Sequence, residues 1–325
     1  MFSPFWFIHR QLFVTIDKPT ASFTGKTVIV TGSNQGLGLE AARWITQLGA
    51  TRVILACRNV DKGRTAATSI RNSTQCSPET IDVWALDMSS YASVQAFSER
   101  VKTELPRLDC LLANAGIMAT KYNVTENNEE TITTNIVSSF LLGFLIHPKL
   151  AETAHKFNTE THLTFPGSEL YKVAKFKERK VPEGKIFATL NSKETANMSD
   201  RYNVSKLMTI LLVEKMGELA PLGKSGVIIN AVCPGFCYSG ITREYSGFAV
   251  SMFHKMFARE TEVGSRLLVD VSSASSASHG HYLPDGKIVT LVGMCKGKEG
   301  QELKARLWAE LSPKLEGIHE GVTKL

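Results

Sequence analysis

Tyr202 and Lys206 form a pair whose residue types and spacing could handle a proton. A separation of four predicts that both side chains lie on one face of a helix, one turn apart, with Tyr202 opening that helix. A phenol titrates near ~10 in water, and an adjacent ammonium favours the phenolate. We therefore expect Lys206 to lower the pKa of Tyr202, so that the pair can exchange a proton with an alcohol or carbonyl oxygen.

A glycine-rich segment, residues 31–38 (TGSNQGLG), lies between a β-branched run and an amphipathic helical pattern, LEAARWITQLG. Glycines permit a tight turn and a close approach of the backbone to a pyrophosphate, and the following helix offers unpaired N–H groups at its N-terminus. This setting favours a phosphate cradle over an ordinary turn. The residues expected to contact a dinucleotide here are Gly32, Ser33, Gln35, Gly36, Leu37 and Gly38.

The end of the second strand-like run bears on which dinucleotide would bind. An NAD-binding unit usually has an acidic residue about twenty positions beyond the glycines, where it binds the adenosine ribose. Here the run ends Ala56-Cys57-Arg58 without a carboxylate, and Arg58 offers a planar fork of donors that suits a 2′-phosphate. The sequence therefore predicts NADP(H), with an ordinary surface arginine at this position as the alternative.

These residues need a scaffold, and the order of strand-like and helical patterns indicates which one. The two patterns alternate from Lys26 onward, which predicts an α/β fold with right-handed crossovers. We expect a single Rossmann-type doubly wound parallel sheet of about seven strands, with helices on both faces. Expected strands are residues 26–30, 51–56, 81–86, 110–113, 162–165 and 227–232, with a seventh around 287–292. Expected helices lie after Gly38, at residues 62–70, 90–104 and 135–146, and after Tyr202.

The domain organisation follows from the absence of an internal repeat or a linker rich in proline and glycine. Residues 23–325 are expected to form one Rossmann-type catalytic domain, preceded by an N-terminal arm at residues 1–22. Residues 170–199 are polar, lysine-rich and weakly periodic, which indicates an insertion between a strand and the next helix. Such an insertion could cover a substrate as a lid, or it could be a surface excursion away from the site.

Composition and charge exclude some classes of function. The chain has 325 residues, 43% of them hydrophobic, and 37 basic against 31 acidic residues give a net charge of +6. Because these charges are spread along the chain, they indicate a solvated surface, and we expect no nucleic-acid partner. The six cysteines form no CxxC pair and no cluster with histidine, so we expect reduced thiols and no metal site.

The first residues of the chain are aromatic but do not resemble a targeting signal. Residues 1–14 have no basic leading region and no cleavage site, and His9 and Arg10 interrupt a stretch too short to span a bilayer. We therefore expect no transmembrane segment and a cytoplasmic protein. The arm is expected to pack on the surface, with a peripheral membrane contact as the alternative.

The order of several motifs resembles that of the short-chain dehydrogenase/reductase family. After the glycine cradle come Asp87 behind the third strand, an Asn-Ala-Gly turn behind the fourth, and Asn135 in the next helix. Gly167-Ser168 follow the fifth strand, the YNVSK segment comes next, and Pro234-Gly235 follow the sixth strand. The resemblance covers residues 23–239 and is strongest to the retinol dehydrogenase and WW-domain oxidoreductase branch, particularly its fungal reductase-like members.

The resemblance implies a role for each matching residue. Ser168 would hydrogen-bond the substrate oxygen, Tyr202 would give or take its proton, and Lys206 would hold the nicotinamide ribose and tune Tyr202. Asn135 would position a water in the proton relay. A turn serine at Ser168 and a locally bonded helix residue at Asn135 are the alternatives. Further cofactor contacts would come from Asp87, Met88, Asn114, Ala115 and Gly116 beside the adenosine, and from Pro234, Gly235 and Ser239 beside the nicotinamide.

The sequence also departs from the family pattern. Ser168 and Tyr202 lie 34 positions apart, whereas many family members place them little more than a dozen apart, so their order rather than their spacing supports Ser168. Pro166 removes a backbone donor at the end of the fifth strand, and the ladder cannot continue there. The region after the cofactor loop is rich in large apolar side chains: Phe236, Tyr238, Tyr245, Phe248, Met252, Phe253, Met256 and Phe257.

These features favour an NADP(H)-dependent oxidoreductase that interconverts a ketone or aldehyde with the alcohol. Core packing is the default for the apolar run after the cofactor loop, but if part of it faces the cofactor, the substrate is lipophilic. The resemblance to fungal reductases suggests a place in secondary metabolism, and family members often form homo-oligomers. The alternatives are a non-redox cyclisation or isomerisation on the same scaffold, and a dinucleotide-sensing module without catalysis.

Overall fold

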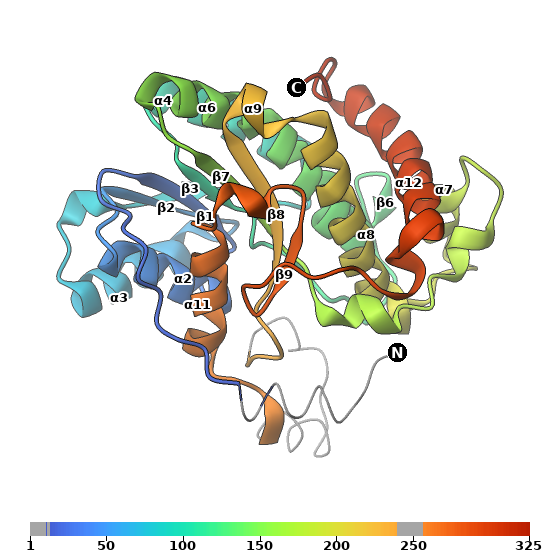
Figure 1. Cartoon of the computed structure of the whole chain (residues 1–325), viewed down its shortest axis with the longest axis horizontal. Coiled ribbons are helices and arrows are strands. Elements are labelled where there is room, and N and C mark those ends of the chain that lie inside the picture. The colour runs from blue at the N-terminus through green and yellow to red at the C-terminus, as the bar shows by residue number, and fades with distance from the viewer. Residues whose placement is uncertain (1–10, 12–13, 239–255) are drawn as a thin grey trace.

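The computed structural model of the chain describes residues 11, 14–238 and 256–325, and these residues form one seven-stranded sheet (Figure 1). The strand order is β3-β2-β1-β4-β7-β8-β9, and every neighbouring pair is parallel. The expected Rossmann-type doubly wound sheet is confirmed. Its strands are β1 (Thr27–Thr31), β2 (Arg52–Cys57), β3 (Ile81–Ala85), β4 (Cys110–Leu112), β7 (Thr161–Pro166), β8 (Val227–Cys233) and β9 (Tyr282–Pro284).

The central strands are buried and mostly apolar because helices cover both faces of the sheet. In β1, Val28 and Val30 enter the hydrophobic core on one face, while Ile29 enters the core on the other. Ile29 pairs in register with Ile54 of β2 and with Leu111 of β4. This double burial explains why the strands read as continuous β-branched runs rather than as alternating patterns.

One face of the sheet carries α2 (Gly36–Gln47), α3 (Val60–Thr74) and α11 (Thr261–Val271). Ala41 and Ile45 of α2 are fully buried, and they share a core with Ile70 of α3 and Leu268 of α11. These three helices lie side by side, with α2 between α3 and α11, and α11 contacts β7 and β8 (Figure 1).

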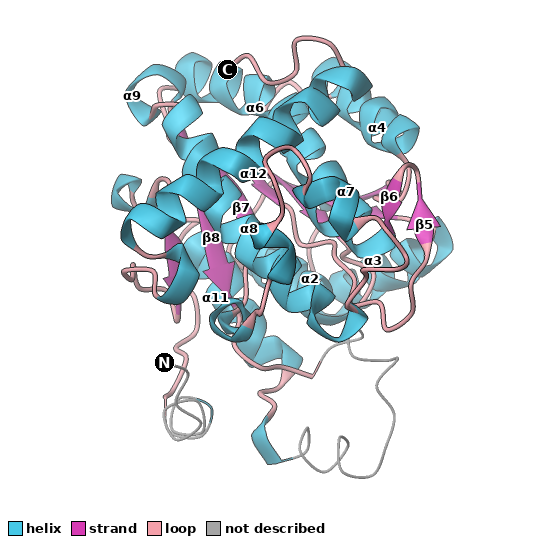
Figure 2. Ribbon diagram, turned by 90° about the vertical axis from the view of Figure 1, so that its right-hand side faces the viewer, coloured by secondary structure: helices cyan, strands magenta, loops and turns pink. Residues whose placement is uncertain are grey.

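The opposite face carries α4 (Tyr91–Glu104), α6 (Ser138–Phe157) and α8 (Met198–Leu219), with α12 (Gly297–Ile318) packed outside α8. Figure 2 shows the molecule turned by 90° with α12 and α8 on the side that faces the viewer. The ring of Trp308 in α12 stacks on that of Phe144 in α6, with centroids 5.6 Å apart. A leucine stripe with a spacing of four holds α12 in place: Leu303, Leu307, Leu311 and Leu315.

One continuous helical stretch, which ends in α6, is both long and apolar. A short α5 (Glu130–Ile132) and a π-helical turn, η2 (Thr133–Val137), run into α6 without a break. Among the described residues only this stretch, Glu130–Phe157, is long and apolar enough to cross a membrane, and 94% of its most apolar window is buried inside the protein. Its apolar character therefore reflects packing on all sides.

Two elements differ from the sequence-based expectation. Residues 287–292 do not form the seventh strand, because β9 pairs through Tyr282 with Ala231 and through Pro284 with Cys233. Asp285 and Gly286, both with positive φ, then turn the chain away from the sheet. A three-residue edge strand that ends in proline has no periodic signature. In addition, α8 begins at Met198, so Tyr202 lies one turn inside the helix rather than at its start.

The insertion is folded against the body of the domain. Residues 170–199 contain most of η3 (Glu169–Val173), then η4 (Lys177–Lys180), α7 (Ile186–Leu190) and the first residues of α8. Phe176 and Phe187 are buried despite the polar composition around them. The backbone N–H groups of Ile186 and Phe187 donate to the carboxylate of Glu310 in α12. The segment is thus fixed to both α8 and α12.

The N-terminal arm is described only in part, since residues 1–10 and 12–13 lie outside the described residues. Ile16 is buried, and its carbonyl accepts a hydrogen bond of 2.6 Å from Arg266 of α11. The Gln11 side chain donates to the carbonyls of Phe236 and Phe257. The six cysteines are all free thiols, and five of them are buried.

Candidate functional site

The loop between β1 and α2 is shaped by glycines at the positions where a side chain would strain or clash. Gly32 and Gly36 have φ of +64° and +61°, a region that residues with a Cβ rarely adopt. Gly38 has no such φ, but a Cβ there would lie 2.5 Å from Asn114 Nδ2 and 2.7 Å from the Gly32 carbonyl oxygen. The loop therefore folds tightly over the sheet edge, as the sequence predicts.

The N-terminus of α2 is open to an anion. Gln35 precedes the helix in extended backbone and is exposed, but its side chain makes no capping hydrogen bond, and the first turn contains no acidic residue. Unpaired N–H groups and the positive end of the helix dipole therefore face outward, which suits a pyrophosphate. Ser33 is different: its buried hydroxyl donates to the Val30 carbonyl, so its side chain serves the turn itself.

This loop lies where the strand order reverses. From β1 the chain builds outward through β2 to β3, and it then returns to β4 on the other side of β1. Asn114, just after β4, donates to the Thr31 carbonyl over 2.9 Å, and the Ala115 N–H donates to Thr31 Oγ1 over 2.8 Å. Dinucleotides bind at this kind of switch point, outside the carboxyl ends of the strands. A Cβ on Gly116 would lie 3.2 Å from Asn135 Oδ1, so this turn also packs tightly.

The carboxyl ends of β2 and β3 carry the residues assigned to the adenosine. Arg58 directly follows β2 and is exposed. Asp87 follows β3, and its carboxylate accepts hydrogen bonds from the backbone and hydroxyl of Ser89. Met88 is buried beneath this turn. The two strand ends thus present a cation and a locally bonded carboxylate on the same edge of the sheet.

Tyr202 and Lys206 lie on α8, at the carboxyl ends of the strands and next to the end of β7. Lys206 Nζ donates to the Pro166 carbonyl over 2.7 Å and lies 5.5 Å from the centroid of the Tyr202 ring. Burial lowers the pKa of Lys206 to about 8. Burial, and secondarily the nearby Cys233, raise the pKa of Tyr202. The expectation that the pKa of this phenol is lowered is therefore wrong, because desolvation by burial is the dominant effect and raises it.

Ser168 follows β7 after Gly167, in the extended backbone that precedes η3. Its Oγ accepts a hydrogen bond from the Leu170 N–H over 3.2 Å, which is the geometry of a turn serine. An oxygen that accepts from the backbone can still donate its proton to a ligand. The turn therefore orients this hydroxyl and is compatible with a role in substrate binding.

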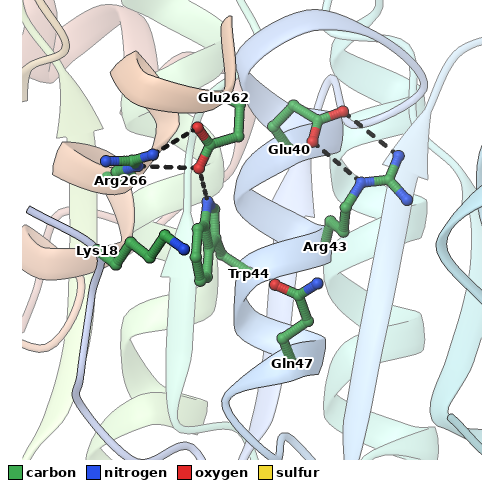
Figure 3. Close-up of a pocket in the computed structure, with 7 residues that line it drawn as sticks. All are labelled: Lys18, Glu40, Arg43, Trp44, Gln47, Glu262 and Arg266. Carbon is green, nitrogen blue, oxygen red and sulfur yellow. Dashed lines mark hydrogen bonds and ion pairs between the residues drawn. The ribbon is translucent and has the colours of Figure 1, made fainter. Parts of the chain in front are cut away.

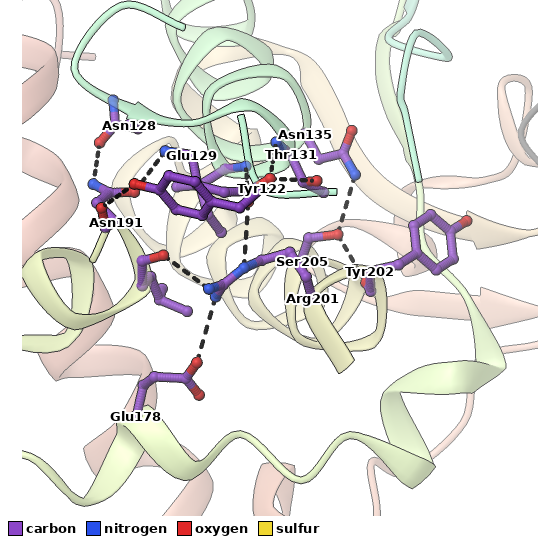
Figure 4. A network of polar contacts seen from close by, with 12 residues as sticks. Tyr122, Asn128, Glu129, Thr131, Asn135, Glu178, Asn191, Arg201, Tyr202 and Ser205 are labelled. Atoms are coloured by element: carbon purple, nitrogen blue, oxygen red, sulfur yellow. Dashed lines mark hydrogen bonds and ion pairs between the residues drawn. The ribbon is translucent and has the colours of Figure 1, made fainter. Parts of the chain in front are cut away.

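Asn135 lies in the middle of η2, and its side chain bonds to distant segments. Its Oδ1 accepts from the Ile117 N–H and its Nδ2 donates to the Ile117 carbonyl, both over 2.9 Å. Nδ2 also lies 3.1 Å from Ser205 Oγ, which in turn donates to the Tyr202 carbonyl (Figure 4). The alternative of a locally bonded helix residue does not fit these contacts. A π-turn is common at functional positions, where it re-aims backbone and side-chain groups.

The loop after β8 completes this edge of the site. Pro234 is buried, and Gly235 has a φ of +81° with its N–H directed at Cys233 Sγ over 3.4 Å. A Cβ on Gly235 would lie 2.8 Å from the Arg259 guanidinium. Ser239 lies outside the described residues. The residues of the apolar run at 245, 248, 252 and 253 lie outside them as well.

A pocket between α2 and α11 does not belong to this site. Trp44 Nε1 donates to Glu262, which pairs with Arg266 at 2.8 Å, and Arg43 pairs with Glu40 at 3.0 Å (Figure 3). These side chains come mainly from α2 and α11 and satisfy one another. None of the predicted site residues lines the pocket, whose walls are Lys18, Glu40, Arg43, Trp44, Gln47, Glu262 and Arg266.

Three residues at the site were missed by sequence reasoning. Ser205 links Asn135 to Tyr202, although its position inside the YNVSK segment gave no sign of this. Arg201 directly precedes Tyr202 and is 1% exposed, whereas a charged residue would be expected on the surface. Tyr282 of β9 hydrogen-bonds Glu169 beside Ser168. Only the position of Arg201 next to Tyr202 could have drawn attention to it.

Comparisons with known proteins identify the relatives of this chain. A family model described as short chain dehydrogenase matches residues 26–156. Over 319 residues the chain is 44% identical to a short chain dehydrogenase/reductase of Cryptosporiopsis sp. (strain 8999), with 98% of each chain covered. Over 325 residues it is 37% identical to a short-chain dehydrogenase of Penicillium roqueforti (strain FM164), covering 97% of this chain and 84% of the relative.

Solved structures show the same fold. A crystal structure of an uncharacterised protein from Mycobacterium paratuberculosis has a TM-score of 0.67 and 25% identity, covering 94% of this chain and 97% of that one. A Pseudomonas aeruginosa RhlG/NADP active-site complex has a TM-score of 0.62 and 19% identity, covering 83% and 98%. A 3-ketoacyl-(acyl-carrier-protein) reductase from Brucella melitensis complexed with NADH has a TM-score of 0.59 and 19% identity, covering 81% and 97%.

A doubly wound sheet with a glycine cradle at its switch point, and a tyrosine and lysine one helical turn apart, defines an oxidoreductase that uses a nicotinamide cofactor. The alignments with the two fungal dehydrogenases span nearly the whole chain and narrow this class of oxidoreductases to one family. The chain belongs to the short-chain dehydrogenase/reductase family.

Proposed function

We propose that this protein is an NADP(H)-dependent oxidoreductase that interconverts a lipophilic ketone or aldehyde with the corresponding alcohol. The observation that carries the proposal is the meeting of Tyr202, Lys206 and Ser168 at the sheet edge that also holds the glycine cradle. Lys206 reaches the last residue of β7, and Ser168 lies two residues further along the chain. This arrangement supports a reacting carbonyl between the cofactor site and α8.

The chain's own groups supply binding, orientation and the proton. In the reducing direction, the Ser168 hydroxyl donates a hydrogen bond to the carbonyl oxygen, and the Tyr202 hydroxyl transfers its proton to that oxygen as the alcohol forms. The raised pKa of Tyr202 means that the phenol carries its proton at neutral pH. Lys206 would hold the ribose of the cofactor, and the reduced nicotinamide, when bound, would supply the hydride.

The preference for NADP(H) is supported by the end of β2. Arg58 is the first residue beyond this strand and is exposed at the edge where the adenosine ribose would lie. The polar side chains of the next three residues are engaged elsewhere: Asn59 caps α3 by accepting from the Lys62 N–H, and Asp61 pairs with Arg64 at 2.7 Å. The guanidinium of Arg58 therefore remains to bind a 2′-phosphate.

The lipophilic character of the substrate is supported by where the apolar run leaves and rejoins the fold. Cys237 forms a β-bridge with Arg259, and Gln11 hydrogen-bonds both Phe236 and Phe257. The segment between these anchors therefore starts and ends beside Gly235. At its two ends Tyr238 and Met256 are 40% and 57% exposed, so large apolar groups stand next to the cofactor loop.

Turnover with a panel of carbonyls tests the reaction. NADPH incubated with lipophilic ketones and aldehydes should be oxidised in the presence of the wild-type protein, and Tyr202→Phe should lower kcat by about 10²–10⁴-fold while NADPH still binds. Undiminished turnover in this variant would remove Tyr202 from its role. Product formation without net cofactor consumption would favour a non-redox reaction instead.

The cofactor preference is tested by comparing two exposed arginines of the same region. Arg58→Ala should raise the Kd for NADPH, measured by fluorescence, about 10-fold or more and leave that for NADH nearly unchanged, because only NADPH carries the 2′-phosphate. Arg64→Ala removes a guanidinium that pairs with Asp61 and serves as the matched control. Equal effects of Arg58→Ala on both cofactors would contradict the proposed contact.

A further inference from the structure

Arg201 is a buried cation at the start of the helix that carries Tyr202. Its side chain is 1% exposed, and its Nη2 donates to the Leu190 carbonyl over 2.8 Å. Nε lies 3.3 Å from Glu129 Oε2, and Nη1 lies 3.5 Å from Glu178 Oε1 (Figure 4). The guanidinium thus joins α8 to the insertion, through Glu178 and Leu190, and to the distant Glu129, and it belongs to the residue directly before the proposed proton donor.

Glu129 connects this cation to the helix that holds Asn135. It is fully buried, and its carboxylate accepts from the backbone N–H and hydroxyl of Thr131 and from the Ile132 N–H, which caps α5. Since α5 continues into η2, the Arg201–Glu129 pair fixes the start of the π-turn relative to α8. Burial raises the pKa of Glu129, and Arg201 opposes this effect.

Glu178 and Leu190 connect the same cation to the insertion. Glu178, which pairs with Arg201, is buried. Asp200, the residue before Arg201, accepts hydrogen bonds from the backbone N–H groups of Lys175 and Phe176. Both residues that precede Tyr202 therefore hold the insertion. Asn191, next to Leu190, closes the network by accepting from the Glu129 N–H over 2.9 Å (Figure 4).

A second link lies one turn further along α8. Ser205 accepts from Asn135 Nδ2 and donates to the Tyr202 carbonyl. Tyr202 is therefore bracketed by two connections to the α5–η2 element, through Arg201 before it and through Ser205 after it. A change at either connection would shift the phenol relative to Asn135.

We propose that Arg201 is a positioning residue for proton transfer at Tyr202. Its ion pairs with Glu129 and Glu178 fix the first turns of α8 against the Asn135 π-turn and the insertion, so that the phenol meets the substrate oxygen in reactive geometry. This inference rests on the proposed function. The insertion is on this view a fixed wall of the site, joined to the proton donor through α8, rather than a hinged lid.

If Arg201 only stabilised the fold, a variant with restored stability would also regain its kcat. A variant in which the whole ion-pair network is replaced by neutral side chains therefore separates a structural role from a positioning role. Arg201→Met alone leaves two buried carboxylates without their cation and should strongly destabilise the fold. The triple variant Arg201→Met/Glu129→Gln/Glu178→Gln removes those charges and should recover much of the melting temperature. If Arg201 positions Tyr202, the kcat of the triple variant should remain about 10- to 100-fold below wild type, since small misplacements of a reacting group are costly.

The matched control is another buried cation on the same side of the domain. Lys304 is 5% exposed and pairs with Glu214 and Glu218 near the other end of α8. Lys304→Met should lower the melting temperature without changing kcat or the pH profile of kcat/KM. Arg201→Lys keeps the charge and should restore part of the kcat lost in Arg201→Met.

Hydrogen exchange of the cofactor-free protein gives a readout that is independent of turnover. Loss of the network in the triple variant should speed exchange in peptides covering both η2 and residues 170–199, whereas Lys304→Met should leave these peptides unchanged. A triple variant with wild-type kcat, pH profile and exchange would overturn the positioning role. If none of the tested carbonyls supports NADPH oxidation by the wild-type protein, the proposed function fails. The exchange result still decides whether Arg201 couples these segments.

Discussion

The hydroxyl of Tyr282 donates a hydrogen bond of 3.1 Å to the carboxylate of Glu169, the residue immediately after Ser168. The ring of Tyr282 also fills the space beside Gly167, where a Cβ would lie 2.9 Å from Cε2. One side chain of the edge strand β9 thus holds both neighbours of Ser168. The orientation of the proposed substrate-binding hydroxyl is therefore set by a residue 114 positions away in the chain.

We expect Tyr282→Phe to remove the hydrogen bond to Glu169 while keeping the ring that packs beside Gly167. Loss of a buried hydrogen bond to a carboxylate should reduce the free energy of unfolding by about 1.5–3 kcal/mol, as measured by urea denaturation. The kcat should also fall, because Ser168 is less well oriented. In a Ser168→Ala background the same substitution should have no further effect on kcat, and a full additional loss there would show that Tyr282 does not act through Ser168.

The lowered pKa of Lys206 predicts a basic limit to activity. The ammonium proposed to hold the ribose loses its proton as the pH rises through about 8, so kcat/KM should fall above that value. The folding stability changes in the opposite sense. Between the folded pKa of about 8 and the unfolded pKa of ~10.4, Lys206 binds more protons in the unfolded chain than in the folded one. The free-energy cost of burying Lys206 therefore decreases as the pH rises through this range. Lys206→Arg keeps its charge and should abolish the limb in the pH profile, even if its kcat is lower. A limb that persists in this variant would belong to another group.

The close approach of Asn114 to Gly38 predicts a severe effect of a single methyl group. Gly38→Ala must displace either Asn114 Nδ2 or the Gly32 carbonyl, and we expect a loss of about 1–3 kcal/mol in unfolding free energy. Cofactor affinity, measured by fluorescence titration, should fall as well because the cradle opens.

Gly317→Ala is the matched control for this substitution. A Cβ on Gly317 of α12 meets nothing within 4 Å, and its φ is ordinary. The substitution should stabilise the helix by up to about 1 kcal/mol and leave cofactor binding unchanged. Similar behaviour of the two variants would mean that the cradle tolerates a side chain at Gly38.

His147 of α6 predicts sensitivity to acid. It is buried, its Nε2 has no hydrogen-bond partner among the described residues, and burial, aided by the nearby His279, lowers its pKa to about 4. Between the unfolded value of ~6.5 and about 4 the unfolded chain binds more protons, so the stability it contributes at neutral pH is lost as the pH falls. This linkage alone amounts to about 2 kcal/mol at pH 5.

Urea denaturation at pH 7 and pH 5 checks this expectation. His147→Met should reduce the stability difference between the two pH values, whereas His155→Gln, which alters an exposed histidine of the same helix, should leave it unchanged. An unaltered difference in His147→Met would assign the acid sensitivity to another buried group, such as His162.

Much of the scaffold follows from local sequence patterns. Six of the seven strands lie where β-branched and other apolar runs predict them, because a parallel strand buried on both faces is mostly apolar. The glycine cradle is also readable, since Gly32 and Gly36 occupy backbone conformations that other residues rarely adopt. The spacing of Tyr202 and Lys206 likewise fixes them on one face of a helix. Their roles toward a substrate and cofactor remain predictions.

Other features were decided only by the tertiary structure. The seventh strand is three residues long, and its pairing with β8 rather than its own sequence defines it. The pKa of Tyr202 is raised rather than lowered, because desolvation is the sum of many surrounding atoms while the spacing to Lys206 reports only one neighbour. Arg201 reads as a surface cation until Glu129 and Glu178 are brought to it from segments 72 and 23 residues away. Sequence periodicity thus determines which elements form, whereas burial and long-range pairing determine what their polar side chains can do.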